Sequence, residues 1–143
     1  MAELNTGLLM FISQRHLEAR VVDHLRAHGF DDLTIAQARL AARLDDDGMR
    51  LTDLAAAAQV TKQTAAFLVG QLERAGYVVR RPDPTDARAR LIRIAERGRA
   101  AQRAARVVER QVEAEWTRHL GADRMAALRA SLLDLREITD PWA

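Results

Sequence analysis

The sequence predicts a mainly α-helical fold that includes one small β-hairpin. Alanine, leucine and arginine, which all favour helices, are abundant, whereas aromatic residues make up only 4% of the chain. Apolar side chains recur at helical spacing along most of the sequence, except at 78–94, where two short β-prone runs flank a loop that contains two prolines. With 143 residues, of which 48% are hydrophobic, the chain is long enough to bury the core of one compact domain.

Composition excludes several classes of function. The sequence has no cysteine, which rules out disulfides, thiolate metal sites and redox switches based on sulfur. It contains no glycine-rich phosphate loop and no recognisable Ser-His-Asp grouping, so we expect neither an enzyme nor a bound cofactor. No apolar run approaches the roughly 20 residues that a membrane-spanning helix needs, and no basic leader precedes the apolar residues at 8–12. We therefore expect a cytoplasmic protein without a membrane partner.

Two helices are expected in the first third of the chain. Residues 4–28 carry an apolar stripe at helical spacing, which ends in a segment that contains Gly29 and two aspartates. A second helix is expected over 33–44, and three aspartates followed by Gly48 end it. Residues 49–51 are compatible with a short strand. The stripe of the first helix consists of Leu4, Leu8, Phe11, Ile12, Ala19, Val22 and Leu25.

Residues 52–76 predict two helices joined by a tight turn. Thr52 is suited to be the N-cap of the first helix, which runs to about Gln59, and Val60 forms the turn. Thr61 is suited to cap the second, longer helix, and Gly76 is a natural residue to end it. Two helices joined in this way form a helix-turn-helix, whose second helix is the recognition helix in DNA-binding proteins.

A β-hairpin is expected directly after this motif. The runs 77–81 and 90–94 flank a loop in which Pro82 and Pro84 restrict the backbone. From about Ala95 the chain returns to helical spacing, and a break at 120–123 separates two further helices. The complete prediction is a winged helix-turn-helix flanked by N-terminal and C-terminal helices. The apolar stripes of the last two helices consist of Ala101, Ala104, Ala105, Val108, Val112 and Trp116, and of Met125, Leu128, Leu132 and Leu135.

The recognition helix has an outer face suited to DNA. Gln63 is able to pair with adenine, the ring of Phe67 is able to meet a thymine methyl group, and Gly70 would let a backbone come close. Phe67 has an alternative role, which is to pack against the hairpin or a neighbouring helix. The inner face carries Ala65, Leu68, Val69, Leu72 and Ala75. The candidate DNA-contacting residues of this helix are Thr61, Lys62, Gln63, Thr64, Phe67, Gly70 and Arg74, and Lys62 is the only lysine in the chain.

The hairpin adds positive charge next to this helix. The net charge of +2 hides an uneven distribution, because residues 61–93 carry seven basic side chains against three acidic ones. The minor groove of DNA is a negative slot that attracts arginine, so we expect Arg80, Arg81, Arg88 and Arg90 to contact DNA from the wing. The alternatives are that these arginines are solvated charges, and that Asp86 and Arg88 form only a surface ion pair.

The order of these elements, together with the segment at 83–98 (DPTDARARLIRIAERG), resembles the MarR family of bacterial winged-helix transcriptional regulators. The resemblance spans essentially the whole chain. Its most specific part is an aspartate two positions before an arginine, followed by an apolar strand and Glu-Arg-Gly. It implies that Asp86 braces the wing and that Arg88 enters the minor groove. At Ala87 the sequence departs from the family, many of whose members carry a further arginine there, so weaker contacts from the wing to phosphate are expected.

Two copies of the chain are expected to act together. A winged helix of about 65 residues does not cover the apolar stripes of the flanking helices. We therefore expect residues 31–95 to form a DNA-binding lobe, and residues 1–30 and 96–143 to form a helical dimerisation lobe. The alternative is a monomer whose flanking helices pack on each other. As the resemblance also implies, a homodimeric repressor would read a pseudopalindromic operator of double-stranded DNA, with its recognition helices in major grooves about 34 Å apart.

By the same resemblance, a small aromatic or phenolic effector is expected to bind between the dimerisation helices and the winged domain. Arg15 is the candidate to meet its carboxylate, although the more ordinary expectation is that Arg15 pairs with Glu18 or across the dimer. His24 and His28 have the spacing of a metal-binding pair, but no convincing further ligand accompanies them, so no metal site is assigned. The alternative function is a winged-helix module for protein–protein interaction without DNA binding, which an exposed Phe67 would suit.

Overall fold

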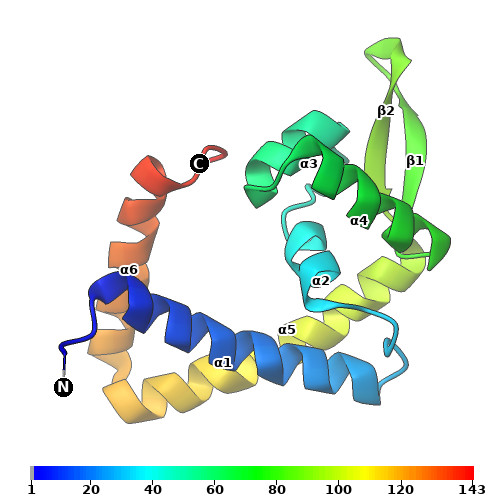
Figure 1. Ribbon diagram of the computed structural model, residues 1–143. Helices are drawn as coiled ribbons and strands as arrows, with labels where there is room; N and C mark the ends of the chain where they lie inside the picture. The colour runs from blue at the N-terminus through cyan, green and yellow to red at the C-terminus, as the bar shows by residue number, and fades with distance from the viewer. Residues whose placement is uncertain (1) are drawn as a thin grey trace.

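The computed structural model describes residues 2–143 and confirms a mainly α-helical fold with one β-hairpin. Six helices and two antiparallel strands follow one another in this part of the chain (Figure 1). They are α1 (Thr6–Ala27), α2 (Ile35–Ala41), α3 (Leu51–Ala58), α4 (Lys62–Arg74), β1 (Val78–Asp83), β2 (Asp86–Ile94), α5 (Glu96–Leu120) and α6 (Ala122–Thr139).

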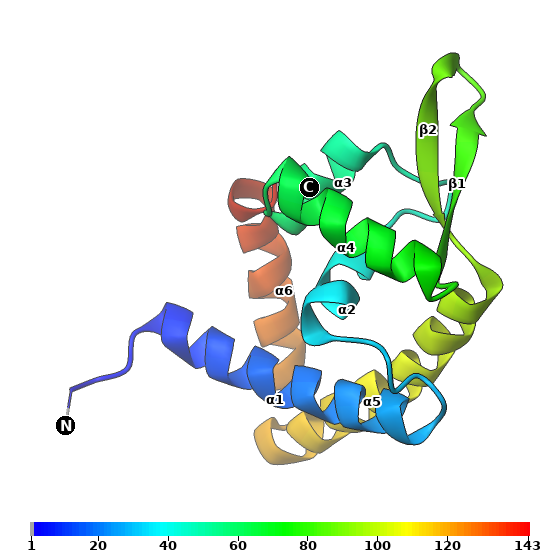
Figure 2. The same cartoon turned by 45° about the vertical axis from the view of Figure 1, so that its right-hand side comes forward.

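The two longest helices, α1 and α5, pack side by side along the lower part of the molecule (Figures 1 and 2). Helix α5 begins at the foot of the hairpin and leads to α6, whose far end returns toward α3. Helices α2, α3 and α4 stand above α1 and α5, and the hairpin projects beyond them. No helix in the described part of the chain combines the length and the apolar character needed to cross a membrane.

Local capping interactions explain where α2 and α4 begin. Thr34 and Gln37 form a reciprocal capping box at the start of α2. At the start of α4, the hydroxyl of Thr61 accepts the backbone N–H of Thr64 at 3.0 Å, which confirms the predicted N-cap. Between α3 and α4, Gln59 takes a left-handed conformation with φ 56°. The tight turn of the helix-turn-helix is therefore a left-handed residue followed two positions later by an N-cap.

Two predicted helix boundaries were wrong. Helix α3 begins one residue before Thr52, after Arg50, whose side chain makes no capping hydrogen bond. The cause is a tertiary contact: Met49 and Ile92 exchange backbone hydrogen bonds of 3.0 and 2.7 Å, so the chain leaves the sheet at Arg50. This single pair is all that forms of the expected short strand. Helix α2 is shorter than the predicted 33–44, because its capping box fixes the start and turns replace the helix after Ala41.

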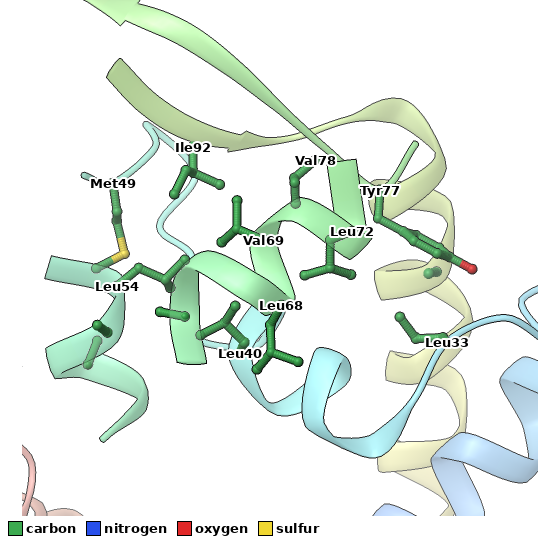
Figure 3. Packing of buried hydrophobic residues seen from close by; sticks show 14 of the residues in the cluster. Leu33, Leu40, Met49, Leu54, Leu68, Val69, Leu72, Tyr77, Val78 and Ile92 are labelled. Carbon is green, nitrogen blue, oxygen red and sulfur yellow. The ribbon is translucent and has the colours of Figure 1, made fainter. Parts of the chain in front are cut away.

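The hydrophobic core lies between α2, α3, α4 and the foot of the hairpin (Figure 3). Each large aliphatic side chain that is fully buried contributes about 1.5–3 kcal/mol. The core also includes Leu25 of α1 and Ala101 of α5, so the winged helix shares it with the two long helices. The predicted inner face of α4 is confirmed, since Ala65, Leu68, Val69 and Leu72 are buried. The largest fully buried side chains are Tyr77, Leu40, Leu54, Leu72, Ile92, Val69, Val78, Val108 and Val112.

Tyr77 joins the start of α5 to the rest of the core. Its hydroxyl donates to Asp32 at 2.5 Å, and Arg97 donates to both oxygens of the same carboxylate while lying 4.3 Å from the centre of the tyrosine ring. The Tyr77 hydroxyl, and then Arg97, hold the pKa of Asp32 below its ordinary value. Burial and the neighbouring Asp32 raise the pKa of Tyr77. The Asp32 carboxylate and the buried ring of Tyr77 therefore connect the start of α5 to the rest of the fold.

Gly98 lies at the closest approach of α5 to this joint. A Cβ atom at position 98 would overlap the backbone oxygen of Tyr77 and would lie 2.6 Å from Cδ1 of Ile94. Both approaches are closer than any ordinary van der Waals contact. The close packing of α5 against Tyr77 and Ile94 therefore explains why a residue without a side chain stands at the end of the Glu-Arg-Gly segment.

The end of α6 contacts the helix-turn-helix. The indole N–H of Trp142 donates to the backbone oxygen of Asp53 in α3 at 2.8 Å. The carboxylate of Asp140 accepts hydrogen bonds from Arg43 at 2.7 Å and from Arg136 at 2.8 Å, and these neighbours, Arg136 first, lower its pKa. The residues after α6 thus link this helix to α2 and α3.

Two helices leave their apolar stripes uncovered. None of the residues of α6 is buried, and the buried residues of α1 lie only in its C-terminal half. Packing within one chain therefore does not cover the flanking helices. The large apolar side chains exposed on the N-terminal segment and on α6 are Leu4, Leu8, Leu9, Met10, Phe11, Ile12, Leu128, Leu132, Leu133, Leu135 and Ile138.

Candidate nucleic-acid interface

Helix α4 presents the outer face that the sequence predicted. Lys62, Gln63 and Thr64 are exposed in its first turn, where the hydroxyls of Thr61 and Thr64 share a hydrogen bond of 2.9 Å. Phe67 is 62% exposed, so the alternative in which it packs against the hairpin or a neighbouring helix is wrong. The inner face of α4 is filled by smaller aliphatic residues, which leaves the ring on the solvent side. An apolar ring among polar side chains is suited to a surface that makes contacts.

Gly70 and Arg74 share the next two turns of this face. The nearest atom to a Cβ at position 70 would be Nη1 of Arg74, at 3.3 Å. The guanidinium group of Arg74 therefore lies back along α4 over the glycine. The small residue leaves room for a long cationic side chain close to the helix surface.

The hairpin is a two-stranded ribbon with an irregular tip. Its strands pair from Val78 and Ile94 at the foot to Pro82 and Arg90, and the register shifts between Pro82 and Asp83. A two-stranded ribbon alone is only marginally stable in water, so contacts outside the ribbon decide how firmly the tip is held. Both Figures 1 and 2 show the tip projecting away from the helices.

The four arginines predicted on the wing do not share one environment. Arg81, Arg88 and Arg90 are exposed, whereas Arg80 is half-buried and pairs with Glu73 of α4 at 3.3 Å. The backbone N–H of Arg88 donates to Asp86 at 3.0 Å. Within residues 2–143 no ion pair joins the side chains of Asp86 and Arg88, so the surface ion pair considered as an alternative does not form.

Asp83 and Arg50 are part of this site, although sequence reasoning missed both. The Asp83 side chain is buried, with 8% of the residue exposed, and accepts the backbone N–H and the hydroxyl of Thr85 at 2.8 and 2.7 Å. Its second oxygen accepts the guanidinium of Arg50 at 2.9 and 2.8 Å. Hydrogen bonds from Thr85, and then from Arg50, lower the pKa of Asp83. Asp86, the predicted brace, is exposed and lies 3.8 Å from the same guanidinium.

The spacing Asp-x-Thr could have indicated Asp83. An aspartate that bonds to the backbone two residues later is a common turn device, and Asp83 and Thr85 have that spacing. The partnership with Arg50 is different, because 33 residues separate the two and only the folded chain brings them together.

A cavity of about 300 Å³ lies between α1, α2 and α5. Its wall is mainly apolar, and the ion pair between Glu18 and Arg39, with distances of 2.6 and 2.7 Å, lies among its lining residues. The expectation that Arg15 pairs with Glu18 in the same chain was therefore wrong, since α2 supplies a closer arginine. Arg15 lies 5.8 Å from the ring centre of Phe11 and is not part of the cavity wall. The polar side chains of the wall are Gln14, Glu18, Arg39, Gln102, Arg106 and Glu109.

The histidine pair at the end of α1 is stacked. The rings of His24 and His28 lie 4.0 Å apart, and Nδ1 of His28 is 2.7 Å from the backbone oxygen of His24. Over the part of the chain that the structure covers, no three side chains of the metal-binding types come together.

Comparisons with known proteins agree with this geometry. The model of the MarR family matches residues 31–89, which contain α2, α3, α4 and most of the hairpin. No curated protein matches the sequence. The fold is similar to wild-type MarR from E. coli in its apo form, at 21% identity and a TM-score of 0.70, covering 94% of this chain and 98% of that one.

Two further solved structures are similar. A MarR transcriptional regulator from Methanosarcina mazei Go1 has a TM-score of 0.75 at 19% identity, covering 92% of this chain and 93% of the other. A point mutant of S. aureus MepR, solved bound to an oligodeoxyribonucleotide, has a TM-score of 0.61 at 22% identity, covering 94% of this chain and 98% of that one. The MarR family model therefore matches the helix-turn-helix and most of the hairpin, and the fold along nearly the whole chain is similar to that of solved MarR-family winged-helix proteins.

Proposed function

We propose that this protein is a homodimeric transcriptional regulator in the cytoplasm that binds double-stranded DNA sequence-specifically and represses transcription. One observation carries the proposal: the outer face of α4 and the arginine-bearing wing that follows it are both exposed, and neither is needed for the core. A helix that exposes such a face fits the major groove of DNA, and exposed arginines on a two-stranded ribbon fit the adjacent minor groove. The DNA-bound S. aureus relative supports the same use of the fold.

Within this proposal, individual residues have separate roles. Gln63 reads a base edge in the major groove, and Phe67 contacts a thymine methyl group. Arg88 enters the minor groove with its guanidinium free of any acidic side chain in the described chain, and Asp86 orders the backbone of Arg88. Arg81, which lies on strand β1 of the wing, contacts a phosphate. The other proposed contacts are Thr61, Lys62, Thr64, Gly70, Arg74, Arg80 and Arg90.

Dimerisation is proposed to cover the open helices. Residues 31–95 form the DNA-binding lobe, while residues 1–30 and 96–143 join two chains. The exposed apolar stripes of α1 and α6 support this division, since an apolar surface of this extent is unusual for a monomer. Two-fold symmetry would set two α4 helices into successive major grooves and would match a pseudopalindromic operator.

The cavity between α1, α2 and α5 is proposed to take a small aromatic or phenolic effector that releases DNA. Its apolar wall suits an aromatic ring, and Arg39 in the wall is a partner for an anionic group. The ion pair with Glu18 would compete for that guanidinium. Arg15 lies outside this cavity, so its proposed contact with an effector requires a surface that the second chain completes.

The test uses DNA selected from a random duplex pool by the parent protein and scored by fluorescence anisotropy. Gln63→Ala should cost about 1–3 kcal/mol and change the preference at one base position. Arg88→Ala should weaken binding to all sequences and reduce the preference for A·T-rich flanks. Arg26→Ala, which removes an exposed arginine from α1, is the matched control and should bind like the parent. If both test variants also bind like the parent, these residue roles are wrong.

The second candidate function is a protein-interaction module, which the 62% exposure of Phe67 favours. DNA binding predicts an affinity that falls steeply with salt, with a slope set by the number of phosphates neutralised. Failure of the parent to enrich any duplex would favour the interaction module. A reporter gene placed behind the selected sequence then separates repression from activation.

A further inference from the structure

We propose that Arg50 is a positioning residue for the wing: by holding Asp83 and Asp86 from the start of α3, it sets where Arg88 meets DNA. The inference rests on the proposed DNA-binding function and goes beyond it, because Arg50 lies on neither the recognition helix nor the hairpin. It concerns how the two DNA-facing elements keep a fixed spacing.

The backbone next to Arg50 is already fastened to the wing. Met49 exchanges two hydrogen bonds with Ile92 of β2, and α3 begins immediately after Arg50. The guanidinium of Arg50 therefore starts from a point that moves with both the sheet and the helix-turn-helix. Its reach to Asp83 connects the tip of the wing to that point.

Asp83 lies at the irregular tip of the wing, beyond the regular pairing of its two strands. The regular pairing of the strands ends at Pro82, and the register shifts just before Asp83. One carboxylate oxygen closes the turn through Thr85, and the other is held by Arg50. The Asp83 side chain is only 7% exposed, so its charge requires the hydrogen bonds and the cation that surround it.

The same guanidinium also reaches the segment that carries Arg88. Nη2 of Arg50 lies 3.8 Å from Asp86, and Asp86 accepts the backbone N–H of Arg88. A chain of contacts thus runs from the start of α3 through Arg50 and the two aspartates to the backbone of Arg88. The side chain of Arg50 is 45% exposed, and its charge is opposed by Asp83, so it is suited to position the wing more than to bind a phosphate.

The sharpest test is a double-mutant cycle with Arg50→Ala and Arg88→Ala on a duplex that the parent selects from a random pool. If Arg50 acts only through the position of Arg88, Arg50→Ala should weaken binding about tenfold, which corresponds to a DNA-competent wing populated about one tenth of the time. The double variant should then bind no more weakly than Arg88→Ala alone. Asp83→Asn should behave like Arg50→Ala, and Arg26→Ala should behave like the parent.

The salt dependence of binding separates positioning from direct contact. A positioning residue leaves the slope of log affinity against log salt unchanged, whereas loss of a phosphate contact lowers it by about 1. Additive losses in the cycle, a reduced slope for Arg50→Ala, or parental affinity in that variant would each overturn the inference. In all three cases Arg88→Ala still tests the proposed function by itself.

Hydrogen exchange gives a readout that needs no DNA. Arg50→Ala and Asp83→Asn should speed exchange of the amides at 85–90 about tenfold while leaving α5 unchanged, and Arg26→Ala should change neither. If the parent binds no duplex, the proposed function fails, and faster exchange at the tip still supports the brace. Unchanged exchange at the tip in a folded Arg50→Ala protein would refute it.

Discussion

Replacing Gly98 with alanine should destabilise the fold, whereas the same replacement at Gly70 should stabilise it. At position 98 the new Cβ would overlap the backbone oxygen of Tyr77 and would lie 2.6 Å from Ile94. The Tyr77 oxygen accepts the N–H of Ala95 at 2.9 Å, so it cannot withdraw without loosening the first turn of α5. Overpacking of this kind costs about 1–3 kcal/mol. The overlapped atom belongs to the backbone, so the upper part of this range, about 2–3 kcal/mol, is expected. The better helix propensity of alanine returns about 1 kcal/mol, which leaves a net loss of about 1–2 kcal/mol.

At Gly70 the balance has the opposite sign. The nearest atom to the new Cβ is Nη1 of Arg74 at 3.3 Å, which is the end of a flexible side chain on an exposed face and is able to move. The propensity gain, up to about 1 kcal/mol, is then not offset. The two variants make the same chemical change in two helices, so the difference between them isolates packing.

Urea unfolding followed by circular dichroism measures both variants. A loss of about 1–2 kcal/mol should lower the midpoint by roughly 0.5–1 M. All samples need one protein concentration, because mass action would stabilise the proposed dimer. A midpoint for Gly98→Ala at or above that of the parent would refute the close-contact reasoning. Equal losses of unfolding free energy in the two variants would show that the effect comes from replacing any helical glycine, and not from the close contact with Tyr77.

Three further predictions concern the exposed apolar faces of α1 and α6, the loss of stability at acid pH and the residues after α6. Glutamate in place of Phe11 or Leu132 should shift the protein from dimer to monomer in sedimentation velocity, because both side chains are exposed in one chain and would be buried between two; an unchanged dimer would exclude these faces from the interface. The pKa of Asp32 is lowered by the Tyr77 hydroxyl and the neighbouring guanidinium, so the folded form binds fewer protons than the unfolded one, and the free energy of unfolding should fall as the pH drops below about 4. Asp32→Asn should flatten this acid limb in urea titrations, and a limb as steep as that of the parent would contradict the assignment. Trp142→Ala removes the hydrogen bond to the backbone of α3, so amides at 140–143 should exchange faster while those of α5 do not, and parental exchange rates there would show that the indole contributes no restraint.

Local signals in the sequence were enough to predict the helix-turn-helix. Thr61 as an N-cap and Gly76 as the end of α4 need only their own neighbours, and both are found, Gly76 with φ 82°. The buried face of α4 also follows from spacing alone. Thr52 failed as an N-cap because a pairing with β2, more than 40 positions away, decides where α3 starts.

The site was predicted less completely than the fold. Exposed residues such as Gln63 and Arg88 could be identified from face and loop position, but the partners of charged groups could not. Glu18 pairs with Arg39 and not with Arg15, and Asp83 pairs with an arginine from another element. Opposite charges are numerous in this chain, with 22 basic and 20 acidic residues, so sequence proximity is a poor guide to which of them meet.

The single lysine of the chain lies at the first residue of the recognition helix, where it is exposed. An amine-reactive ester therefore has one side chain to acylate, and that side chain would be covered when a duplex occupies α4. The rate at which Lys62 is acylated, followed by mass spectrometry, therefore reports whether the outer face of α4 is covered. It requires no engineered label, and it can be recorded on untagged protein while candidate effectors are added.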